Sequence, residues 1–263
     1  MYTLANKMYA PLLLLLNQSL AFQKAKVSYE RTEEYCAQRE DKEYTGTKPF
    51  NMEKNLVISG ISFGYSVISV LNNLCLEFAV GRIYAITGKS GIGKTTIIKL
   101  LARLLFPDDG KVYVDGVNAT EIDYIEYRRN VLYMPQQAVI FDSSLRDNIT
   151  LGLEFADSDV YTSLEMVGMS DFVTSLSNGI DSFIGIRYRD ISEGEKQRIC
   201  LARTIIRKPK IILLDEPTSH LDEISTQTIY NCLNKYRISQ NATIIIVTHT
   251  LKGDFADEWI RLK

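Results

Sequence analysis

The stretch "GKSGIGKTT", Gly88–Thr96, constrains this chain more than any other, because it prescribes a backbone loop with a definite kind of ligand. It matches the pattern G-x-x-x-x-G-K-S/T of the phosphate-binding loop, or Walker A motif. Glycines let the backbone curl so that successive N–H groups form a nest for anionic oxygens. We expect Lys94 to reach the β- and γ-phosphates and Thr95 to place its hydroxyl on Mg²⁺. The predicted nucleotide-binding residues are Gly88, Lys89, Ser90, Gly91, Gly93, Lys94, Thr95 and Thr96.

The residues around the loop supply the setting that this motif needs. Arg82–Thr87 predicts a short buried strand, and Ile97, Leu100, Leu101 and Leu104 recur at helical spacing. The helix would add the positive end of its dipole to the loop. A glycine-rich turn that arose by chance is the alternative, and the strand–loop–helix order argues against it.

A second informative stretch is "IILLDEPTSHLD", Ile211–Asp222. Its apolar start predicts a buried parallel strand with carboxylates at its C-terminal end, which is the edge where open α/β sheets bind ligands. We expect Asp215 to hold Mg²⁺, in part through water. Glu216 would act as the base or orienting group for an attacking water. A strand that merely ends in acidic residues is the alternative, and the phosphate loop makes it less plausible.

The segment "ISEGEKQRICLARTI", Ile191–Ile205, predicts a capped helix. Ser192 is a suitable N-cap, and Gly194 frees the backbone of the first turn. A buried stripe is expected from Ile199, Ala202 and Ile206. Taken alone, this segment is an ordinary amphipathic helix.

Composition excludes several classes of protein. The 263 residues are 46% hydrophobic and 24% charged, which is typical of a globular protein. The net charge of -2 gives no sign of a nucleic-acid-binding domain. No C-x-x-C pair occurs, so we expect reduced, mostly buried cytosolic thiols at Cys36, Cys75, Cys200 and Cys232.

Five strings in a fixed order resemble the nucleotide-binding domain of ABC transporters. They are the Walker A loop, "YMPQQAVIFDSSLRDNI", "ISEGEKQRICLAR", "IILLDEPTSHLD" and "IIIVTHT". The resemblance begins near Asn55 and runs to the end of the chain. It implies an α/β P-loop NTPase fold with a RecA-like core around a parallel sheet. It also implies an antiparallel β subdomain near residues 55–82 and an ABC-specific α-helical subdomain near 138–205, with an N-terminal helix before them.

The resemblance assigns roles to further residues. Tyr65 matches the aromatic residue that stacks on adenine, although a core tyrosine at a strand end is an alternative. Gln136 matches the glutamine that touches Mg²⁺ and senses the membrane domain. His249 matches the switch histidine that contacts the γ-phosphate, and Asp222 matches the D-loop residue that meets the opposing subunit. The implied catalytic set is Lys94, Gln136, Glu216 and His249, and the implied Mg²⁺ ligands are Thr95, Gln136 and Asp215.

The opposing-subunit signature departs from the family pattern. Ser192 and Gly194 match the serine and second glycine of "LSGGQ", which close over the partner's γ-phosphate. Glu193 replaces the first glycine, and Glu195 replaces the glutamine. Carboxylates near a triphosphate are repelled unless they point away or pair with a cation such as Lys196.

The segment after Gln136 resembles the exporter type of the family. In "AVIFDSSLRDNI", an apolar-Phe pair precedes a short helix, with Ser144 and Asp147 as a variant capping box. "SFIGIRYRDISEGE" occupies the place of the exporter coupling loop, with Ile186 where the family usually has glutamate.

The start of the chain resembles the last membrane helix of an exporter as it leaves the bilayer. The leucine run Leu12–Leu16 is shorter than the ~20 apolar residues of a spanning helix. We therefore predict a truncated membrane helix and its solvated extension over 1–40, a linker over 41–54 and the ABC ATPase domain over 55–263. The chain would then be either a fragment made for recombinant expression or the product of a truncated reading frame.

The resemblance implies an ATP-hydrolysing exporter subunit that dimerises around two ATP molecules, with Mg²⁺, at the cytoplasmic face of the cell membrane. The isolated fragment would be soluble or peripherally associated. One alternative is an ATP-gated clamp with little turnover, as in the degenerate half of a heterodimeric exporter. Another is a soluble ABC ATPase acting on DNA or ribosomes, which the absence of a basic sequence disfavours. The expected partners are a second ATPase domain and a membrane-spanning domain, without nucleic acid, while the cargo and the choice between homodimer and heterodimer stay open.

Overall fold

The computed structural model describes residues 18, 22–33, 45–65, 68–189, 191–219, 221–249 and 253–262. The chain divides into two units, Met1–Tyr44 and Thr45–Lys263. In the first unit, a helix over 22–33 has all of its residues exposed. Its Lys26 and Glu30 form an ion pair at 3.7 Å, one turn apart. This is the solvated helix that the sequence predicts, whereas the leucine run, Cys36 and part of the predicted linker lie outside the described residues. Among the described helices, none is both long enough and apolar enough to cross a membrane.

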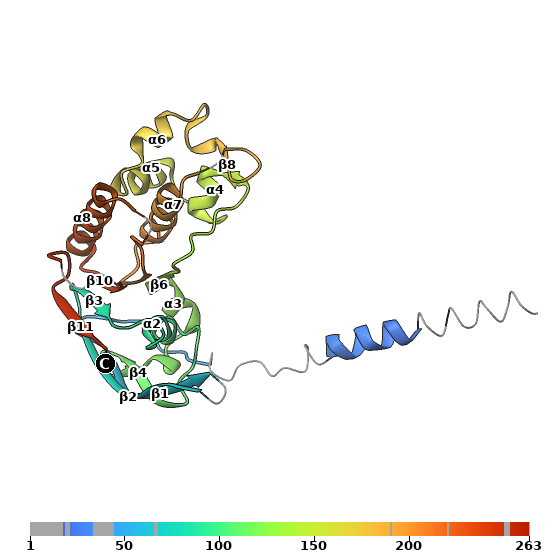
Figure 1. Ribbon diagram of the computed structural model, residues 1–263, viewed down its shortest axis with the longest axis vertical. Coiled ribbons are helices and arrows are strands. Elements are labelled where there is room, and N and C mark those ends of the chain that lie inside the picture. Colours follow the sequence, from blue (N-terminus) through green and yellow to red (C-terminus); the bar gives the residue numbers. More distant parts are fainter. Residues whose placement is uncertain are drawn as a thin grey trace, which may run out of the picture. The chain divides into compact units, whose positions relative to one another are not determined.

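A five-stranded parallel sheet forms the centre of the second unit (Figure 1). Its strands lie in the order β11-β3-β10-β9-β6. Every residue of β3, β9 and β10 is buried, so these strands are mostly apolar on both faces instead of alternating, with Thr87, Asp215 and Thr243 as polar residues at their ends. The predicted strand at Arg82–Thr87 is confirmed from the second residue onward. The strands are β3 (Ile83–Thr87), β6 (Val131–Met134), β9 (Ile211–Asp215), β10 (Thr243–Val247) and β11 (Glu258–Arg261).

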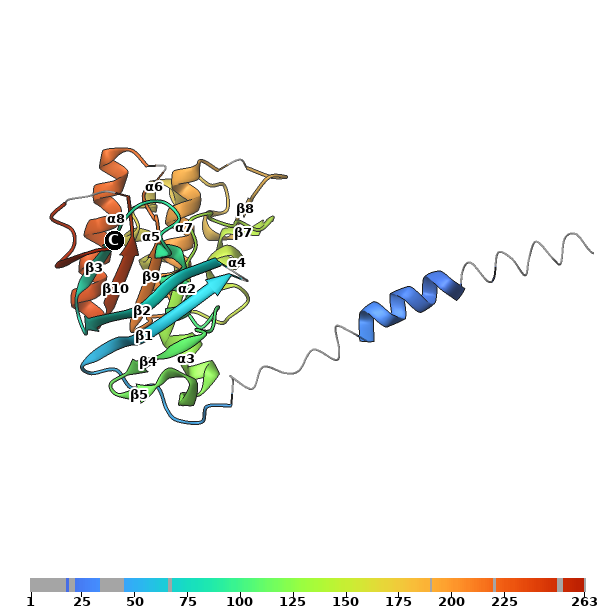
Figure 2. The same ribbon diagram turned by 60° about the horizontal axis from the view of Figure 1, so that its bottom comes forward.

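Alternate residues of these strands enter two separate hydrophobic cores. Ile212 and Leu214 of β9 belong to one core, together with side chains of α7 (Glu193–Ile205) and α8 (Glu223–Gln240). Ile211 and Leu213 belong to the other, which contains α2 (Lys94–Leu101). The pleat of a strand sends consecutive side chains to opposite faces, so α2 and α8 cover opposite faces of one sheet (Figure 2).

A four-stranded antiparallel sheet, in the order β2-β1-β4-β5, completes the core that contains α2. The predicted subdomain near residues 55–82 corresponds to β1 and β2, but it is too short, since β4 and β5 also join the sheet. Leu56 of β1 pairs with Val114 of β4, a contact between distant parts of the chain that local patterns do not reveal. The strands are β1 (Asn55–Tyr65), β2 (Ile68–Ala79), β4 (Asp109–Val114) and β5 (Val117–Asn118). The 3-10 helix η2 (Ala119–Glu121) and α3 (Tyr124–Asn130) lead from this sheet to β6.

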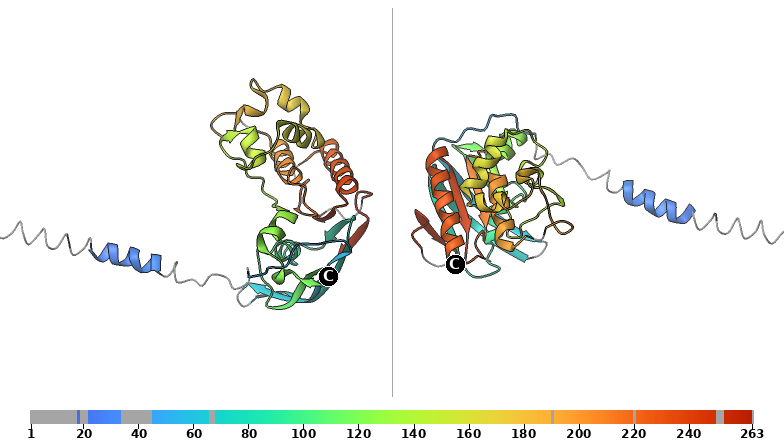
Figure 3. Two further views of the ribbon diagram at one scale, coloured as in Figure 1. Left: turned by 180° about the vertical axis from the view of Figure 1, so that it is seen from behind. Right: turned by 90° about the horizontal axis from the view of Figure 1, so that it is seen from above.

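Helices gather at the other end of the unit, above the parallel sheet in Figure 1 and again in Figure 3. Ser144 caps α4 by accepting a hydrogen bond from the Asp147 N–H at 3.0 Å, which is one of the two hydrogen bonds of the predicted capping box. The Asp147 carboxylate accepts from the hydroxyl of Ser143 at 2.6 Å. The buried faces of the helices at this end pack with α7 and α8 in one hydrophobic core. The elements are the two-stranded sheet of β7 (Ser143–Ser144) and β8 (Phe183–Ile184), the helices α4 (Leu145–Thr150), α5 (Asp157–Met166) and α6 (Ser170–Thr174), and the 3-10 helix η3 (Gly179–Asp181).

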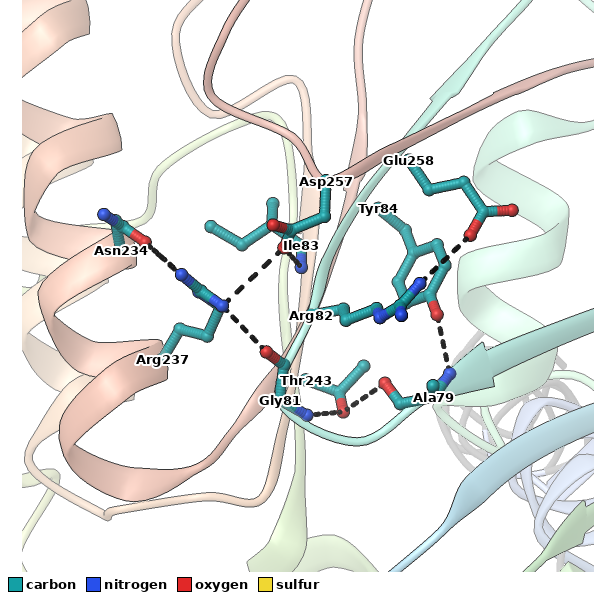
Figure 4. Close-up of polar contacts among 10 residues, drawn as sticks. All are labelled: Ala79, Gly81, Arg82, Ile83, Tyr84, Asn234, Arg237, Thr243, Asp257 and Glu258. Carbon is teal, nitrogen blue, oxygen red and sulfur yellow. Dashed lines mark hydrogen bonds and ion pairs between the residues drawn. The ribbon is translucent and has the colours of Figure 1, made fainter.

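Polar side chains fasten the parallel sheet where β3 and β10 begin (Figure 4). Arg237 of α8 donates to the Gly81 carbonyl at 3.0 Å and lies 3.8 Å from the Asp257 carboxylate. Asp257 accepts the Ile83 N–H at 2.7 Å. Thr243 accepts from the Gly81 N–H and donates to the Ala79 carbonyl, both at 3.2 Å. These contacts hold the β2–β3 turn against α8, at the edge opposite to the phosphate loop.

Candidate nucleotide-binding site

The phosphate loop connects the carboxyl end of β3 to the first residue of α2. Its backbone takes left-handed conformations, with φ of 79° at Gly91 and 100° at Gly93. A Cβ at Gly93 would also approach Leu71 to 2.8 Å and Val70 to 2.9 Å. Only glycine meets both demands. Gly93 is the N-cap of α2 and has no side chain, so the first-turn N–H groups keep room for an anion.

Lys94 is buried within the curl of this loop, with 6% of its surface exposed. Its ammonium group donates to the carbonyls of Gly88 and Lys89 at 2.9 and 3.0 Å. The loop therefore encloses the cation that the sequence assigns to the phosphates. Thr96 is buried beside it, while Lys89 and Ser90 are exposed.

Asp215 stands at the carboxyl end of β9, directly across from the loop. Its Oδ1 accepts the hydroxyl of Thr95 at 3.2 Å, and its Oδ2 lies 3.5 Å from the hydroxyl of Tyr133. Burial raises the pKa of Asp215, and the charge of Glu216 raises it further, against the hydrogen bonds from Thr95 and Tyr133. Burial and the neighbouring Asp215 also raise the pKa of Tyr133 to about 12, so its phenol stays protonated.

Tyr133 is not among the residues that the sequence singled out. The feature that could have identified Tyr133 is its position as the penultimate residue of β6, a strand that pairs in register with β9. A single tyrosine in an apolar strand is interpreted as a core residue as long as the neighbouring strand is unknown.

Glu216 forms a cluster with two other predicted residues, Gln136 and His249. Its Oε2 accepts from the Gln136 amide at 2.8 Å, and its Oε1 lies 2.5 Å from Nε2 of His249. Its backbone has φ of 50°, a strained value for a residue with a side chain. The Glu216 N–H donates to the Val247 carbonyl at 2.9 Å, which ties this conformation to β10. The carboxyl ends of β6, β9 and β10 thus bring Gln136, Glu216 and His249 together.

The oxygen donors at this edge suit a magnesium ion. Mg²⁺ prefers hard oxygen ligands and keeps several waters, so a few protein oxygens are enough. The hydroxyl of Thr95, the Asp215 carboxylate and the amide of Gln136 are ligands of this kind. A cation here would also offset the electrostatic repulsion between the carboxylates of Asp215 and Glu216, through which Glu216 raises the pKa of Asp215.

Tyr65 is the last residue of β1, and 47% of its surface is exposed. Its ring contacts Phe63 edge-on, with ring centroids 4.9 Å apart. An exposed ring at a strand end suits a stacking surface better than a core position, and the contact with adenine stays a prediction.

The signature residues form the first turn of α7. Ser192 caps this helix, and its hydroxyl donates to the Glu195 carboxylate at 2.7 Å. Glu195 also accepts the Ser192 N–H at 2.8 Å, which completes a capping box. Glu193 pairs with Lys196 at 3.1 Å, the compensation that the sequence suggested for this carboxylate. The space beside Gly194 is limited by Leu221, since a Cβ there would come within 2.9 Å of its side chain.

Asp222 caps α8 by accepting the Ser225 N–H at 2.7 Å. That hydrogen bond, with others from its own turn, holds the pKa of Asp222 below its usual range. A local capping role is therefore present, and the contact with an opposing subunit stays a prediction.

Comparisons with known proteins agree with this geometry. The family model described as ABC transporter matches residues 71–219. The ABC-type transporter fsqE of Aspergillus fumigatus is 34% identical over 219 residues, covering 79% of this chain and 17% of that protein. The ABC transporter B family member 2 of Dictyostelium discoideum is 36% identical over 204 residues, covering 76% of this chain and 14% of that protein. The chain thus spans less than a fifth of the length of these curated relatives.

A solved structure shows the same fold. The "Structure of a bacterial Atm1-family ABC exporter with ATP bound" superimposes with a TM-score of 0.82 at 27% identity, over 92% of this chain and 43% of that one. Together with a Walker A loop that faces Asp215 and Glu216 across the sheet edge, these matches identify the chain. It belongs to the ABC transporter family, and its fold is that of an exporter-type nucleotide-binding domain.

Proposed function

We propose that this chain binds and hydrolyses ATP as the engine of an ABC exporter, with two nucleotide-binding domains closing around two ATP molecules. The observation that carries the proposal is the cluster in which Glu216 contacts both Gln136 and His249 beside the phosphate loop. A carboxylate that accepts from Gln136 and contacts His249 at the carboxyl edge of the sheet is placed to take a proton from a water molecule.

Each residue then has a role in phosphoryl transfer. Lys94 and the loop N–H groups stabilise charge on the transferred group. Glu216 accepts the proton of the attacking water, and His249 and Gln136 orient that carboxylate. Thr95, Asp215 and Gln136 would hold Mg²⁺, which neutralises charge on the phosphate oxygens when bound. Lys94 has to exchange its bonds to Gly88 and Lys89 for bonds to phosphate.

The partner domain would complete each site with its own Ser192 and Gly194. A homodimer or a heterodimer is compatible with this arrangement. The relatives' names and the exporter structure support attachment to a membrane-spanning domain at the cytoplasmic face of the membrane. The helix over 22–33 would connect the two, as the continuation of a membrane helix.

The test is the steady-state rate of ATP hydrolysis as a function of protein concentration. We expect the specific rate to rise with concentration, because each site needs two domains. Glu216→Gln should lower the rate by about 10²–10⁴-fold, the contribution of a general base. It should still bind ATP and should elute as a dimer in gel filtration with ATP and Mg²⁺.

Two controls make this result specific. Glu165→Gln removes an exposed carboxylate from α5 and should leave the rate unchanged. Lys94→Ala should abolish ATP binding. Retained ATP binding by Lys94→Ala, or an unchanged rate for Glu216→Gln, would overturn the proposed mechanism.

One observation favours the alternative of an ATP-gated clamp with little turnover. The hydroxyl of Ser192 is already bonded to Glu195 at 2.7 Å, so it has to leave that carboxylate before it can meet a phosphate. Glu195→Gln restores the residue usual in the family. A higher rate of ATP hydrolysis in this variant would show that the capping box slows turnover. An unchanged rate would show that glutamate in place of glutamine at position 195 has no effect on turnover.

A further inference from the structure

We propose that Tyr133 is a positioning residue for the magnesium carboxylate, whose hydroxyl holds Oδ2 of Asp215 so that Oδ1 is presented toward Thr95. This inference rests on the proposed function, since it concerns the same site. Tyr133 would touch neither nucleotide nor metal and would act through Asp215.

The strands place Tyr133 and Asp215 on one face of the sheet, the face that α2 with Thr95 covers. Residues alternate between faces, and Val131 of β6 lies in the same core as Ile211 and Leu213 of β9. Tyr133 packs against that core, and the parity of β9 turns Asp215 to the same face. The core also contains α2, the helix that carries Thr95. Tyr133 and Thr95 therefore approach Asp215 from two different elements.

The contacts divide the carboxylate between two donors. Thr95 bonds to Oδ1 at 3.2 Å, and the Tyr133 hydroxyl lies 3.5 Å from Oδ2. The second distance is at the outer limit of a hydrogen bond. Contacts in ligand-free sites are often long and tighten when the ligand binds. The terminal torsion of an aspartate is broad, so a donor on one oxygen restricts which oxygen faces a ligand.

Such a donor behind a metal ligand raises affinity without touching the metal. Residues that orient ligating groups typically contribute about 10–100-fold to metal affinity. Asp215 is only 4% exposed, so water has little access to replace the phenol as a donor. The competing explanation is that Tyr133 serves only to pack its ring against the core.

Tyr133→Phe separates these two explanations, because it keeps the ring and removes the hydroxyl. The matched control is Tyr127→Phe, which removes another phenol of the same core. The Tyr127 hydroxyl donates to the Leu101 carbonyl at 2.7 Å. Both variants lose one hydroxyl, and only the first loses a donor to Asp215.

The measurement is Mn²⁺ binding to the full chain by electron paramagnetic resonance, with a non-hydrolysable ATP analogue present. We expect Tyr133→Phe to weaken Mn²⁺ binding about tenfold. Analogue affinity in EDTA should stay the same, and Tyr127→Phe should bind Mn²⁺ like the parent chain. Thermal denaturation of each variant confirms that it is folded.

Each outcome decides between the explanations. Unchanged Mn²⁺ affinity in Tyr133→Phe, or an equal loss in Tyr127→Phe, would overturn the positioning role. Weaker analogue binding in EDTA would also overturn it, since the effect would then lie in the loop. Failure of the parent chain to bind analogue or Mn²⁺ would instead contradict the proposed function.

Discussion

The buried polar residues of this domain differ in how many of their hydrogen-bonding groups have a partner. Asp215 is held by Thr95 and Tyr133, which makes its burial tolerable in a site that needs a carboxylate. Gln197 of α7 is fully buried, and neither its amide nitrogen nor its amide oxygen has a hydrogen-bond partner among the described residues. A buried amide without partners destabilises the state that contains it.

Gln197→Met should therefore increase the free energy of unfolding. The change conserves volume, and removal of an unsatisfied amide should add about 1–2 kcal/mol. Urea denaturation followed by circular dichroism measures this difference. Gln227→Met, at an exposed position of α8, is the matched control and should have little effect. A less stable Gln197→Met would mean that the amide is satisfied in solution.

Three of the described helices begin at polar N-cap residues that can be read from the sequence, whereas the pairing of the antiparallel sheet cannot be read from a local pattern. Ser144, Ser192 and Asp222 each cap a helix, because an N-cap needs only a short polar side chain and the next three residues. The link between β1 and β4 instead depends on Asp115, which follows β4. Its carboxylate accepts three backbone N–H groups, those of Glu53, Lys54 and Asn55, at 2.6, 3.0 and 2.9 Å.

Asp115→Asn should weaken this link. Burial raises the pKa of Asp115, but the three backbone donors outweigh it and the pKa is lowered overall. A lowered pKa means that the charged carboxylate stabilises the fold above its unfolded pKa, near 4, and that this contribution is lost as the pH falls. Asparagine tolerates the left-handed backbone of position 115, so the change is mainly electrostatic.

We expect Asp115→Asn to reduce the free energy of unfolding by about 1.5–3 kcal/mol at pH 7, the range for hydrogen bonds to a charged group. The reduction should shrink at acid pH. Urea denaturation at several pH values measures it, with Asp109→Asn, an exposed aspartate at the start of β4, as the control for a lost charge. A reduction that grows on acidification would contradict the assignment.

At the scale of the whole molecule, one sheet supports both hydrophobic cores. Neighbouring residues of β9 and β10 face opposite cores, so neither core can lose its packing without disturbing the other. The cysteines can be used as probes of whether the two cores unfold together. Cys200 and Cys232 carry free thiols in the core with α7 and α8, whereas Cys75 is exposed, so two of the three described cysteines are buried, in agreement with the expectation of mostly buried thiols.

We expect thiol labelling to reveal one cooperative transition. Burial raises the pKa of Cys232 to about 12 and also raises that of Cys200, so neither forms a reactive thiolate in the folded domain. In a Cys36→Ser background, DTNB should modify Cys75 at once. Cys200 and Cys232 should react only at the urea concentration where Trp259 fluorescence changes. Labelling of Cys200 well before that point would show that the helices open separately.

The sequence by itself determined the family, the fold class and most residues of the candidate nucleotide site. Those features depend on local chemistry: glycines at strained turns, an apolar strand ending in Asp215 and Glu216, and capping residues three positions before a partner. Gly91 and Gly93 occupy the left-handed backbone that such a loop requires. Residues of this kind can be recognised in a sequence because their conformation or charge is unusual wherever they occur.

Only the tertiary structure decided which side chains from separate elements meet. The strand order β11-β3-β10-β9-β6 places β6 next to β9, and this adjacency brings Tyr133 to Asp215. The same edge brings Gln136 and His249 to Glu216 from segments more than thirty residues away in either direction. The pairing of β1 with β4 was hidden for the same reason. Contacts between distant segments depend on strand order and register, and these are settled by packing of the whole domain.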